Sequence, residues 1–262
     1  MPPSAGEAGD APARTVVVTG GGKGIGKAIT ERFARSGDSV IAVGRDERAL
    51  KDAVHEQTEL GGVVDYRVCD VTVEDSVKAL FEQIDRVDIL VNNAGTAISA
   101  PLHKTTLAQW QEQISVNATS AFLCTRAVVT QMRERDRGRI VFVASTAGVV
   151  GSRYTSGYVA SKHAEVGFMR AVAAELAGTG VTANAVCPGY VRTEMTEKSI
   201  ERIVEKTGRT EDEARAALSS SSPLGRLLEP SEVAAAVAFL ASDEAGAING
   251  QLVIMDGGGI QR

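Results

Sequence analysis

Short apolar runs rich in valine and isoleucine recur along the chain and alternate with longer amphipathic stretches. Such runs, bounded by turn residues, are typical of strands that a parallel sheet buries on both faces. They lie at 15–19, 39–43, 64–68, 88–92, 139–145, 181–186 and 251–255. Strand then helix, repeated without a Pro/Gly-rich linker, predicts an α/β fold: a single doubly wound domain with a parallel sheet and helices on both faces.

Two segments fall outside this alternation. Residues 1–13 are small and polar and lack the basic and apolar regions of a secretory signal, so we expect a disordered tail before a domain at 14–262. Residues 194–224 are polar and helix-prone and follow a strand end without leading straight into another strand. An insertion at that edge of a sheet is a usual place for a substrate lid, here a small helical one. The alternative interpretation is a surface decoration.

The composition narrows the class of protein. Of 262 residues, 44% are hydrophobic and 23% charged, and the net charge is −5, which is typical of a soluble globular protein. No block of like charge predicts a nucleic-acid surface, and no apolar run approaches the roughly 18 residues of a membrane span. Cys69, Cys124 and Cys187 form no CxxC pair, so we expect free thiols in a cytoplasmic protein. No His, Asp or Glu grouping has metal-ligand spacing, so we expect no catalytic metal.

A glycine-rich stretch, VVVTGGGKGIG, connects the first predicted strand to a helix. Gly20, Gly24 and Gly26 allow a tight turn and a close backbone approach, and the helix N-terminus offers free N–H groups to a pyrophosphate. A flexible loop can have the same composition, but the position between strand and helix favours dinucleotide binding. The TGxxxGxG spacing differs from the GxGxxG of the usual fingerprint.

Six motifs follow one another in the order found in the compact short-chain dehydrogenases/reductases, and the chain resembles that family from Thr15 to Gly259. The motifs are TGGGKGIG (19–26), NNAG (92–95), SVNATSAF (115–122), GRIVFVAST (138–146), YVASK (158–162) and CPGYVRT (187–193). The resemblance implies a Rossmann-like fold, a nicotinamide cofactor and oxidoreductase activity between a hydroxyl and a keto group. Residues 144–191 are especially similar to bacterial 3-oxoacyl and polyketide ketoreductases.

Tyr158 precedes Lys162 by four residues, so a helix places both side chains on one face. Reduction of a ketone needs a proton for the developing alkoxide. An ordinary phenol has a pKa near 10, and moving it toward about 7 requires ~4 kcal/mol of preferential stabilisation of the phenolate. A nearby ammonium acts in that direction. Taken alone, the pair is also compatible with two surface residues, or with a core tyrosine beside a solvated lysine.

The resemblance completes a catalytic tetrad with Asn117 and Ser145. Ser145 ends a predicted strand at the sheet edge where open α/β folds place their sites, and its hydroxyl can donate to a substrate oxygen; the alternative is a turn or cap residue. Asn117 lies in an apparent helix, where asparagine is mildly unfavourable. The resemblance implies that it holds a helix irregularity and a water that links Lys162 to solvent. A buried amide that satisfies backbone groups is the alternative, and both can hold.

The end of the second strand, VIAVGRDER, bears on the choice of cofactor. Gly44 stands where the NAD-binding members of the family carry an acid, and Arg45 can meet a 2′-phosphate, with Lys23 as a second cation. We therefore expect NADP(H) over NAD(H); the alternative is two solvated cations, with Asp46 paired to Arg45. The resemblance implies further cofactor contacts, besides the glycines, Tyr158 and Lys162, from Ile25, Asp70, Val71, Asn92, Ala94, Gly95, Pro188, Gly189, Val191 and Thr193. Thr193 resembles the residue that fixes the nicotinamide carboxamide.

Candidate substrate residues form a mixed, mostly apolar set that suits an acyl or cyclic ketone. They are Ile98, Val150, Tyr154, Tyr190 and Met195. A carrier-protein partner is weakly supported, because acidic residues dilute the cluster of Arg133, Arg135, Arg137 and Arg139.

The sequence thus predicts an NADP(H)-dependent oxidoreductase that interconverts a ketone and a secondary alcohol, with a 3-oxoacyl thioester or polyketide-like ketone as substrate. An NAD(H)-dependent dehydrogenase of a cyclic or hydroxyacyl-CoA alcohol stays open. A non-catalytic nucleotide-binding regulator or structural subunit is disfavoured, because all four catalytic groups are present. The resemblance also implies a homo-oligomer, a tetramer or a dimer.

Overall fold

The sheet predicted from the apolar runs is present. The computed structural model describes residues 13–59, 61–220 and 222–261, and within them seven parallel strands form one sheet in the order β3-β2-β1-β4-β5-β6-β7. Their bounds are β1 Thr15–Thr19, β2 Ser39–Gly44, β3 Val63–Val68, β4 Ile89–Asn92, β5 Gly138–Val143, β6 Val181–Pro188 and β7 Leu252–Met255. All seven predicted runs form strands.

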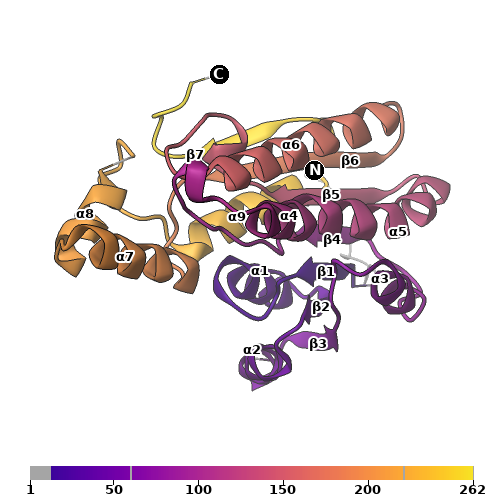
Figure 1. The fold of residues 1–262 in the computed structure, drawn as a ribbon. Helices are drawn as coiled ribbons and strands as arrows, with labels where there is room; N and C mark the ends of the chain where they lie inside the picture. The colour runs from indigo at the N-terminus through magenta and orange to yellow at the C-terminus, as the bar shows by residue number, and fades with distance from the viewer. Residues whose placement is uncertain (1–12, 60, 221, 262) are drawn as a thin grey trace, which may run out of the picture.

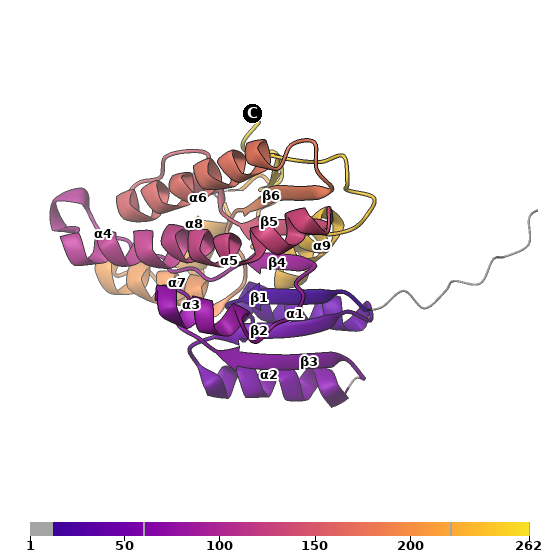
Figure 2. The ribbon, with the colours of Figure 1, turned by 90° about the vertical axis from the view of Figure 1, so that its right-hand side faces the viewer.

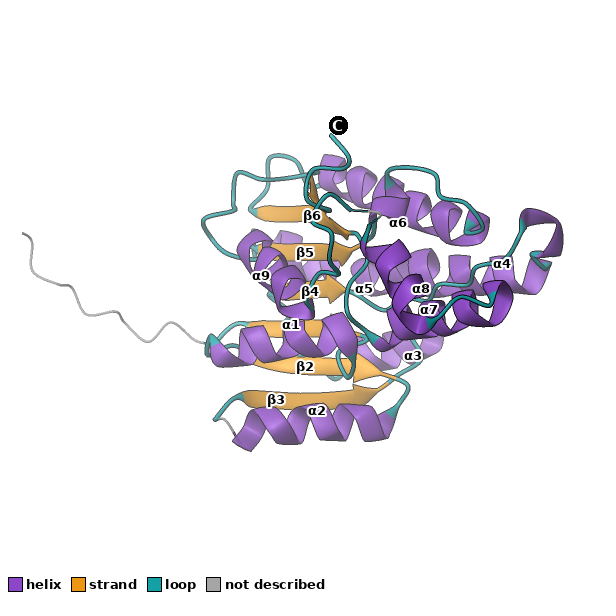
Figure 3. Cartoon of the chain, turned by 90° about the vertical axis from the view of Figure 1, so that its left-hand side faces the viewer, coloured by secondary structure: helices purple, strands orange, loops and turns teal. Residues whose placement is uncertain are grey.

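Helices cover both faces of this sheet, as predicted. Helices α1, α2 and α9 lie over one face (Figure 1, Figure 3), and Figure 2 shows α3, α5 and α6 over the other. The bounds are α1 Gly24–Arg35, α2 Glu47–Glu59, α3 Glu74–Phe81, α4 Leu107–Ile114, α5 Ser120–Glu134, α6 Ser156–Glu175, α7 Glu194–Thr207, α8 Glu211–Ser219 and α9 Pro230–Leu240. Three short segments are η1 Leu102–Lys104, the π-helix η2 Ser115–Thr119 and η3 Thr146–Gly148.

The apolar runs are continuous because each strand feeds two hydrophobic cores. Val16 and Val18 of β1 pack with Ile29 and Phe33 of α1 in the core shared with α9. Val17 points the other way, into the core formed with α3, α5 and α6. Since successive side chains of a strand alternate between faces, both kinds of position must be apolar in a sheet that helices cover on both sides.

The strand order fixes where a ligand can bind. From β1 the chain builds outward to β3, then returns to the other side of β1 with β4, so the direction of winding reverses between β1 and β4. In open parallel sheets the crevice outside the carboxyl ends of the strands at this point is the usual ligand site. Thr19 and Asn92, the last residues of these two strands, lie at that edge.

The predicted helical insertion 194–224 forms α7 and α8, which lie beyond the strand arrowheads in Figure 3. The two helices have a small core of their own, built from Ile200, Ala214 and Leu218 with Leu227. The insertion therefore stands at the carboxyl edge, where the sequence placed it; its role as a substrate lid stays a prediction. Of the predicted tail 1–13, all but Ala13 lies outside the described residues.

Truncation of Phe142 to alanine tests the packing of the central strand. Phe142 in β5 is fully buried and meets Phe168 of α6 edge to face at 6.0 Å between ring centroids. Loss of this ring leaves a cavity, so we expect Phe142→Ala to lower the free energy of unfolding by about 3–5 kcal/mol in chemical denaturation. Phe239→Ala is the matched control, because its ring is half exposed on α9, and the expected loss is below about 1 kcal/mol. Equal losses would contradict this account of the core.

Candidate active site

The glycine-rich turn is shaped for a close approach. Gly20 and Gly24 have φ values of 67° and 51°, which favour glycine. A Cβ on Gly26 would lie 2.0 Å from the Gly20 carbonyl oxygen, so no larger side chain fits there. Helix α1 begins at Gly24, and no side chain caps its first turn at Lys23. A twelve-residue helix whose first N–H groups lack a side-chain cap fits a pyrophosphate, and these residues would hold one.

A threonine hydroxyl joins this turn to the segment after β4. Thr19 Oγ1 accepts hydrogen bonds from the N–H groups of Asn93 and Ala94, both at 3.0 Å, and the Asn93 side chain donates to the Thr19 carbonyl at 2.9 Å. The two segments therefore form one wall at the point where the sheet reverses its winding. Asn93 was absent from the predicted site residues, although it lies inside the NNAG motif.

The cations near the second strand have partners that differ from the sequence-based alternative. Asp46 pairs with Lys23, with 2.7 Å between Nζ and Oδ2, and Arg45 lies 3.9 Å from Asp70. Both cations are exposed, so each pair is weak and can be exchanged for a phosphate. Arg45 and Asp70 line an open pocket of about 440 Å³, to which Arg67 adds a cation that the sequence reasoning missed.

Asp70 is held ready on the wall of this pocket. The hydroxyl and backbone N–H of Thr72 both donate to Asp70 Oδ1, at 2.7 and 3.0 Å, and these bonds hold the pKa of the carboxyl below its usual range. Val71 beside it is buried. The carboxylate is therefore fixed as a hydrogen-bond acceptor next to Arg45.

Ser145 lies past the end of β5 and caps η3. The strand ends at Val143, two residues earlier than predicted, because the Ser145 hydroxyl accepts a hydrogen bond from the Ala147 N–H at 3.1 Å and turns the chain. The capping alternative is therefore real, but the hydroxyl hydrogen is not used in that bond. Lys162 on α6 donates from Nζ to the Val143 carbonyl at 2.9 Å, which ties α6 to the same strand end.

Asn117 lies in the π-helix η2, so the helix irregularity implied by the family resemblance is present. Its side chain is fully buried and makes three bonds: it accepts from Thr96 N–H at 2.8 Å and donates to the Thr96 carbonyl at 2.9 Å and to Ser161 Oγ at 2.8 Å. Ser161 in turn donates to the Tyr158 carbonyl at 2.8 Å. Asn117 thus also satisfies backbone groups; the water relay stays a prediction.

Two glycine contacts show how closely the segments predicted for catalysis and for cofactor binding approach each other. A Cβ on Gly95 would lie 3.3 Å from Asn117 Oδ1 and 3.7 Å from Lys162 Nζ. At the other end of the turn, a Cβ on Gly24 would lie 3.2 Å from Thr193 Cγ2. Thr193 caps α7. Of the predicted residues before it, Pro188 ends β6, and the connection to α7 holds Gly189, Tyr190 and Val191.

The comparisons agree with this geometry. The model of the short chain dehydrogenase family matches residues 14–203. The chain belongs to that family. It is 38% identical to D-beta-hydroxybutyrate dehydrogenase of Cupriavidus necator over 94% of this chain and 97% of the relative, and 39% identical to a 3-oxoacyl-(acyl-carrier-protein) reductase of Thermotoga maritima over the same shares. A solved variant of actinorhodin polyketide ketoreductase with NADPH superposes with a TM-score of 0.91 at 36% identity, covering 95% of this chain and 98% of that one.

Three segments of the chain meet at the predicted substrate side. The Ala100 N–H donates to the Tyr154 carbonyl at 2.8 Å, and Arg202 of α7 donates to the Ser99 carbonyl at 3.3 Å. Ile98 therefore lies on a loop that contacts both the Tyr154 segment and the insertion. The predicted substrate side chains Tyr154, Tyr190 and Met195 are exposed, and Ile98 and Val150 are half-buried.

One buried side chain in the site was missed by the sequence reasoning. Glu165 on α6 lies with Oε2 at 2.7 Å from Lys162 Nζ, and both side chains are almost wholly buried. Burial raises the pKa of the Glu165 carboxyl to about 7, although the ammonium acts in the opposite direction. For Lys162, burial lowers the pKa, but Glu165 and Tyr158 raise it by more. The available signal was a glutamate three residues after Lys162 on an otherwise small and apolar helix face.

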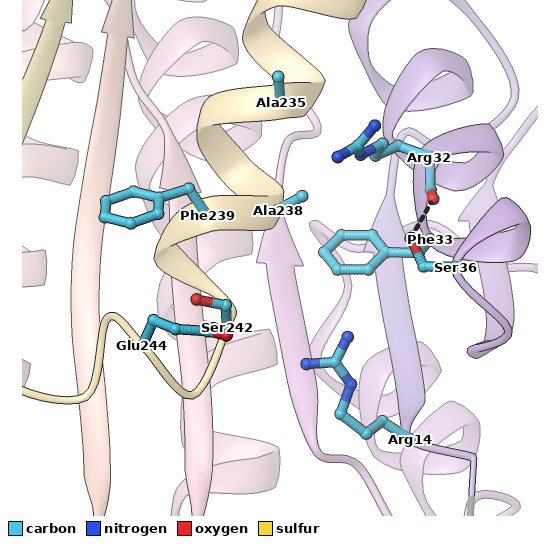
Figure 4. A pocket seen from close by; sticks show the side chains of 9 residues that line it. All are labelled: Arg14, Arg32, Phe33, Ser36, Ala235, Ala238, Phe239, Ser242 and Glu244. Atoms are coloured by element: carbon cyan, nitrogen blue, oxygen red, sulfur yellow. Dashed lines mark hydrogen bonds between the residues drawn. The ribbon is translucent and has the colours of Figure 1, made fainter. Parts of the chain in front are cut away.

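The opposite edge of the sheet carries a shallow groove that takes no part in this site. Figure 4 shows it between the last turns of α1 and α9, with Phe33 and Phe239 on facing helices and Arg14 below them. In the described part of the chain, no group of three or more His, Cys, Asp or Glu side chains could hold a metal ion. None of the helices in those same ranges is long and apolar enough to cross a membrane.

The raised pKa of Glu165 predicts a distinct pH dependence of stability. A glutamate in an unfolded chain titrates near 4.3, and in the folded protein this carboxyl titrates at about 7. Between these values the folded state holds a proton that the unfolded chain has lost, so the stability that Glu165 contributes is complete below about pH 4 and is lost as the pH rises to about 7. Relative to Glu165→Gln, the wild type should lose up to about 4 kcal/mol of unfolding free energy across this window in denaturant titrations.

Glu175→Gln is the control for this prediction, because Glu175 is exposed at the end of the same helix. Its unfolding free energy should run parallel to that of the wild type at every pH. A constant difference between wild type and Glu165→Gln from about pH 4 to about pH 8 would show that Glu165 keeps the ordinary titration of a solvated carboxyl.

Proposed function

We propose that the protein is an NADP(H)-dependent ketoreductase that interconverts a 3-oxoacyl thioester, or a polyketide-like ketone, and the corresponding secondary alcohol. The observation that carries this proposal is the convergence of four groups at the carboxyl edge of the sheet. Lys162 is bonded to the end of the strand that precedes Ser145, and Asn117 is bonded through Ser161 to the backbone of Tyr158. A regulator or structural subunit would have no need of these four groups beside the glycine-rich turn.

The residues around the turn support the phosphorylated cofactor. When bound, the nicotinamide supplies the hydride; the chain binds and orients it. Gly44 places no carboxylate at the end of β2, where one would repel a 2′-phosphate. Arg45 and Lys23 are exposed cations, and Arg67 lines the adjoining pocket together with Arg45. One solved relative carries NADPH, which agrees with this choice. The close contact of Gly24 with Thr193 supports a role for Thr193 in orienting the nicotinamide end.

The chain's own groups divide the remaining work. The Ser145 hydroxyl, whose oxygen already accepts from Ala147, keeps its hydrogen for the substrate oxygen. Tyr158 delivers the proton to the developing alkoxide in reduction and removes it in oxidation. The Lys162 ammonium stabilises the phenolate that remains. Asn117 holds the helix irregularity that keeps this side of the site open to proton exchange.

The substrate class rests on what two relatives act on. One relative is named for a β-hydroxy acid and another for a 3-oxoacyl group, and both place the reacting carbon at position 3 of an acyl chain. The half-buried Ile98 and Val150 offer apolar contact for such a chain. The acyl chain of a 3-oxoacyl thioester suits this apolar lining better than a sugar does.

The arginine cluster does not support a carrier-protein partner. It runs from the end of α5 to the start of β5, at the amino edge of the sheet, opposite the predicted catalytic groups. Arg135 donates to the Val87 carbonyl, Arg137 pairs with Asp243, and Arg139 is buried against backbone carbonyls. The carrier protein, the homo-oligomer and the cytoplasmic location stay predictions.

Replacement of Tyr158 by phenylalanine removes only the hydroxyl that carries the proton. With NADPH and a short 3-oxoacyl-CoA, we expect a loss of kcat/KM of at least about 100-fold, because general acid catalysis contributes factors of about 10²–10⁴. The affinity for the cofactor, measured by quenching of protein fluorescence, should change little. Tyr66→Phe on the exposed edge strand β3 is the control and should keep full activity. Activity retained in Tyr158→Phe would exclude Tyr158 as the proton donor.

Replacement of Arg45 by alanine tests the cofactor choice. Loss of a charged contact to a 2′-phosphate should raise the KM for NADPH about 10-fold or more and leave the KM for NADH nearly unchanged. Arg126→Ala removes an exposed arginine from α5 and should alter neither constant. A parallel rise for both cofactors, or a preference of the wild type for NADH, would refute the assignment of Arg45 to the phosphate.

A further inference from the structure

Along α6, the predicted catalytic lysine has a titratable side chain on each side. Tyr158, Lys162 and Glu165 are spaced i, i+4 and i+7 on α6, so they lie on one face with the lysine in the middle. Lys162 Nζ lies 2.7 Å from Glu165 Oε2 and donates at 2.9 Å to the Val143 carbonyl. Glu165 is only 1% exposed, and its side chain contacts this ammonium.

The surroundings make Glu165 the negative group that acts most directly on the lysine. Cys187 on β6 faces the pair, but burial raises the pKa of this thiol to about 11, so it is neutral. The buried side chains that face α6 from α4, η2 and η3 carry no charge: Gln113, Asn117 and Ser145. Further titratable or charged neighbours are Tyr190 after β6 and, on α6 itself, Tyr158 and the exposed His163 and Arg170.

We infer that Glu165 is a positioning residue that holds the Lys162 ammonium at the end of β5 and weakens its electrostatic effect on Tyr158. The ammonium stabilises a phenolate on one side and a carboxylate on the other, and the carboxylate opposes the ionisation of the phenol. Glu165 thereby sets the pH range over which Tyr158 changes between proton donor and proton acceptor. This inference deepens the proposed function and rests on it.

A second consequence concerns the lysine's position. Even without the Glu165 charge, the ammonium keeps the Val143 carbonyl, and a glutamine at position 165 offers an amide oxygen at the same place. Lys162 can therefore stay protonated when the carboxylate is removed, so the expected effect on Tyr158 has one direction. The phenol should ionise at lower pH, because the same ammonium is no longer neutralised.

The test is a substrate-free titration of tyrosinate by ultraviolet difference absorbance. The signal of Tyr158 is isolated by subtracting the same titration of Tyr158→Phe, in the wild-type and in the Glu165→Gln backgrounds. We expect Glu165→Gln to move the midpoint to lower pH by about one unit, the size of effect that the loss of one buried charge on the same helix face produces. The high-pH decline of kcat/KM for ketone reduction should move by the same amount.

Glu175→Gln removes an equal charge from the exposed end of α6 and should leave the midpoint in place. If Glu165→Gln does not fold, Glu165→Met, which removes the charge without burying a new polar group, is titrated instead and should give the same shift. Glu165→Asp keeps the charge and should restore most of the wild-type midpoint.

An unchanged midpoint in both Glu165 variants would overturn the inference and leave the pair as core structure alone. A midpoint moved to higher pH would also overturn it, because it would show that Lys162 loses its proton once the carboxylate is removed. Because the titration uses no substrate, a shifted midpoint in a protein that reduces no ketone would refute the proposed function and leave the coupling intact.

Discussion

The buried ammonium of Lys162 is the group on which the site depends. A charge that is removed from water must be matched by hydrogen bonds and opposite charge, or it is lost by deprotonation. Here the Val143 carbonyl and the Glu165 carboxylate meet that need. The bond to the Val143 carbonyl also joins α6 to the end of β5, so one hydrogen bond both satisfies the ammonium and fixes the helix against the strand.

The uncharged groups extend this arrangement to the loops. Asn117 lies in the π-helical turn η2, and its buried amide uses the oxygen and one of its two N–H donors on Thr96. The remaining donor reaches Ser161 on α6. The loop after β4 is thus held by α6 through one side chain and by β1 through the Thr19 hydroxyl. The residues predicted for cofactor binding and for catalysis are therefore joined by one set of hydrogen bonds.

Sequence reasoning located the sheet and proposed the catalytic groups because their signals are local. A strand buried on both faces must be a run of apolar residues, and a glycine at a positive φ or a close contact, as at Gly20 and Gly26, leaves its mark in the sequence. The end of β5 was placed two residues too late because Ala144 and Ser145 continue the apolar and small pattern, whereas the cap at Ser145 is a three-dimensional feature.

The partners of the charged residues could not be predicted from local sequence signals. Asp46 could pair with Arg45 next to it in sequence, but the turn brings Lys23 closer. Glu165 suggests a solvated helix face, since glutamates are rarely buried unless paired. Its partner Lys162 was a predicted catalytic residue, yet a spacing of three residues is equally compatible with an exposed and with a buried ion pair. What decides between them is the packing of α6 against β6 and η3, which only the fold specifies.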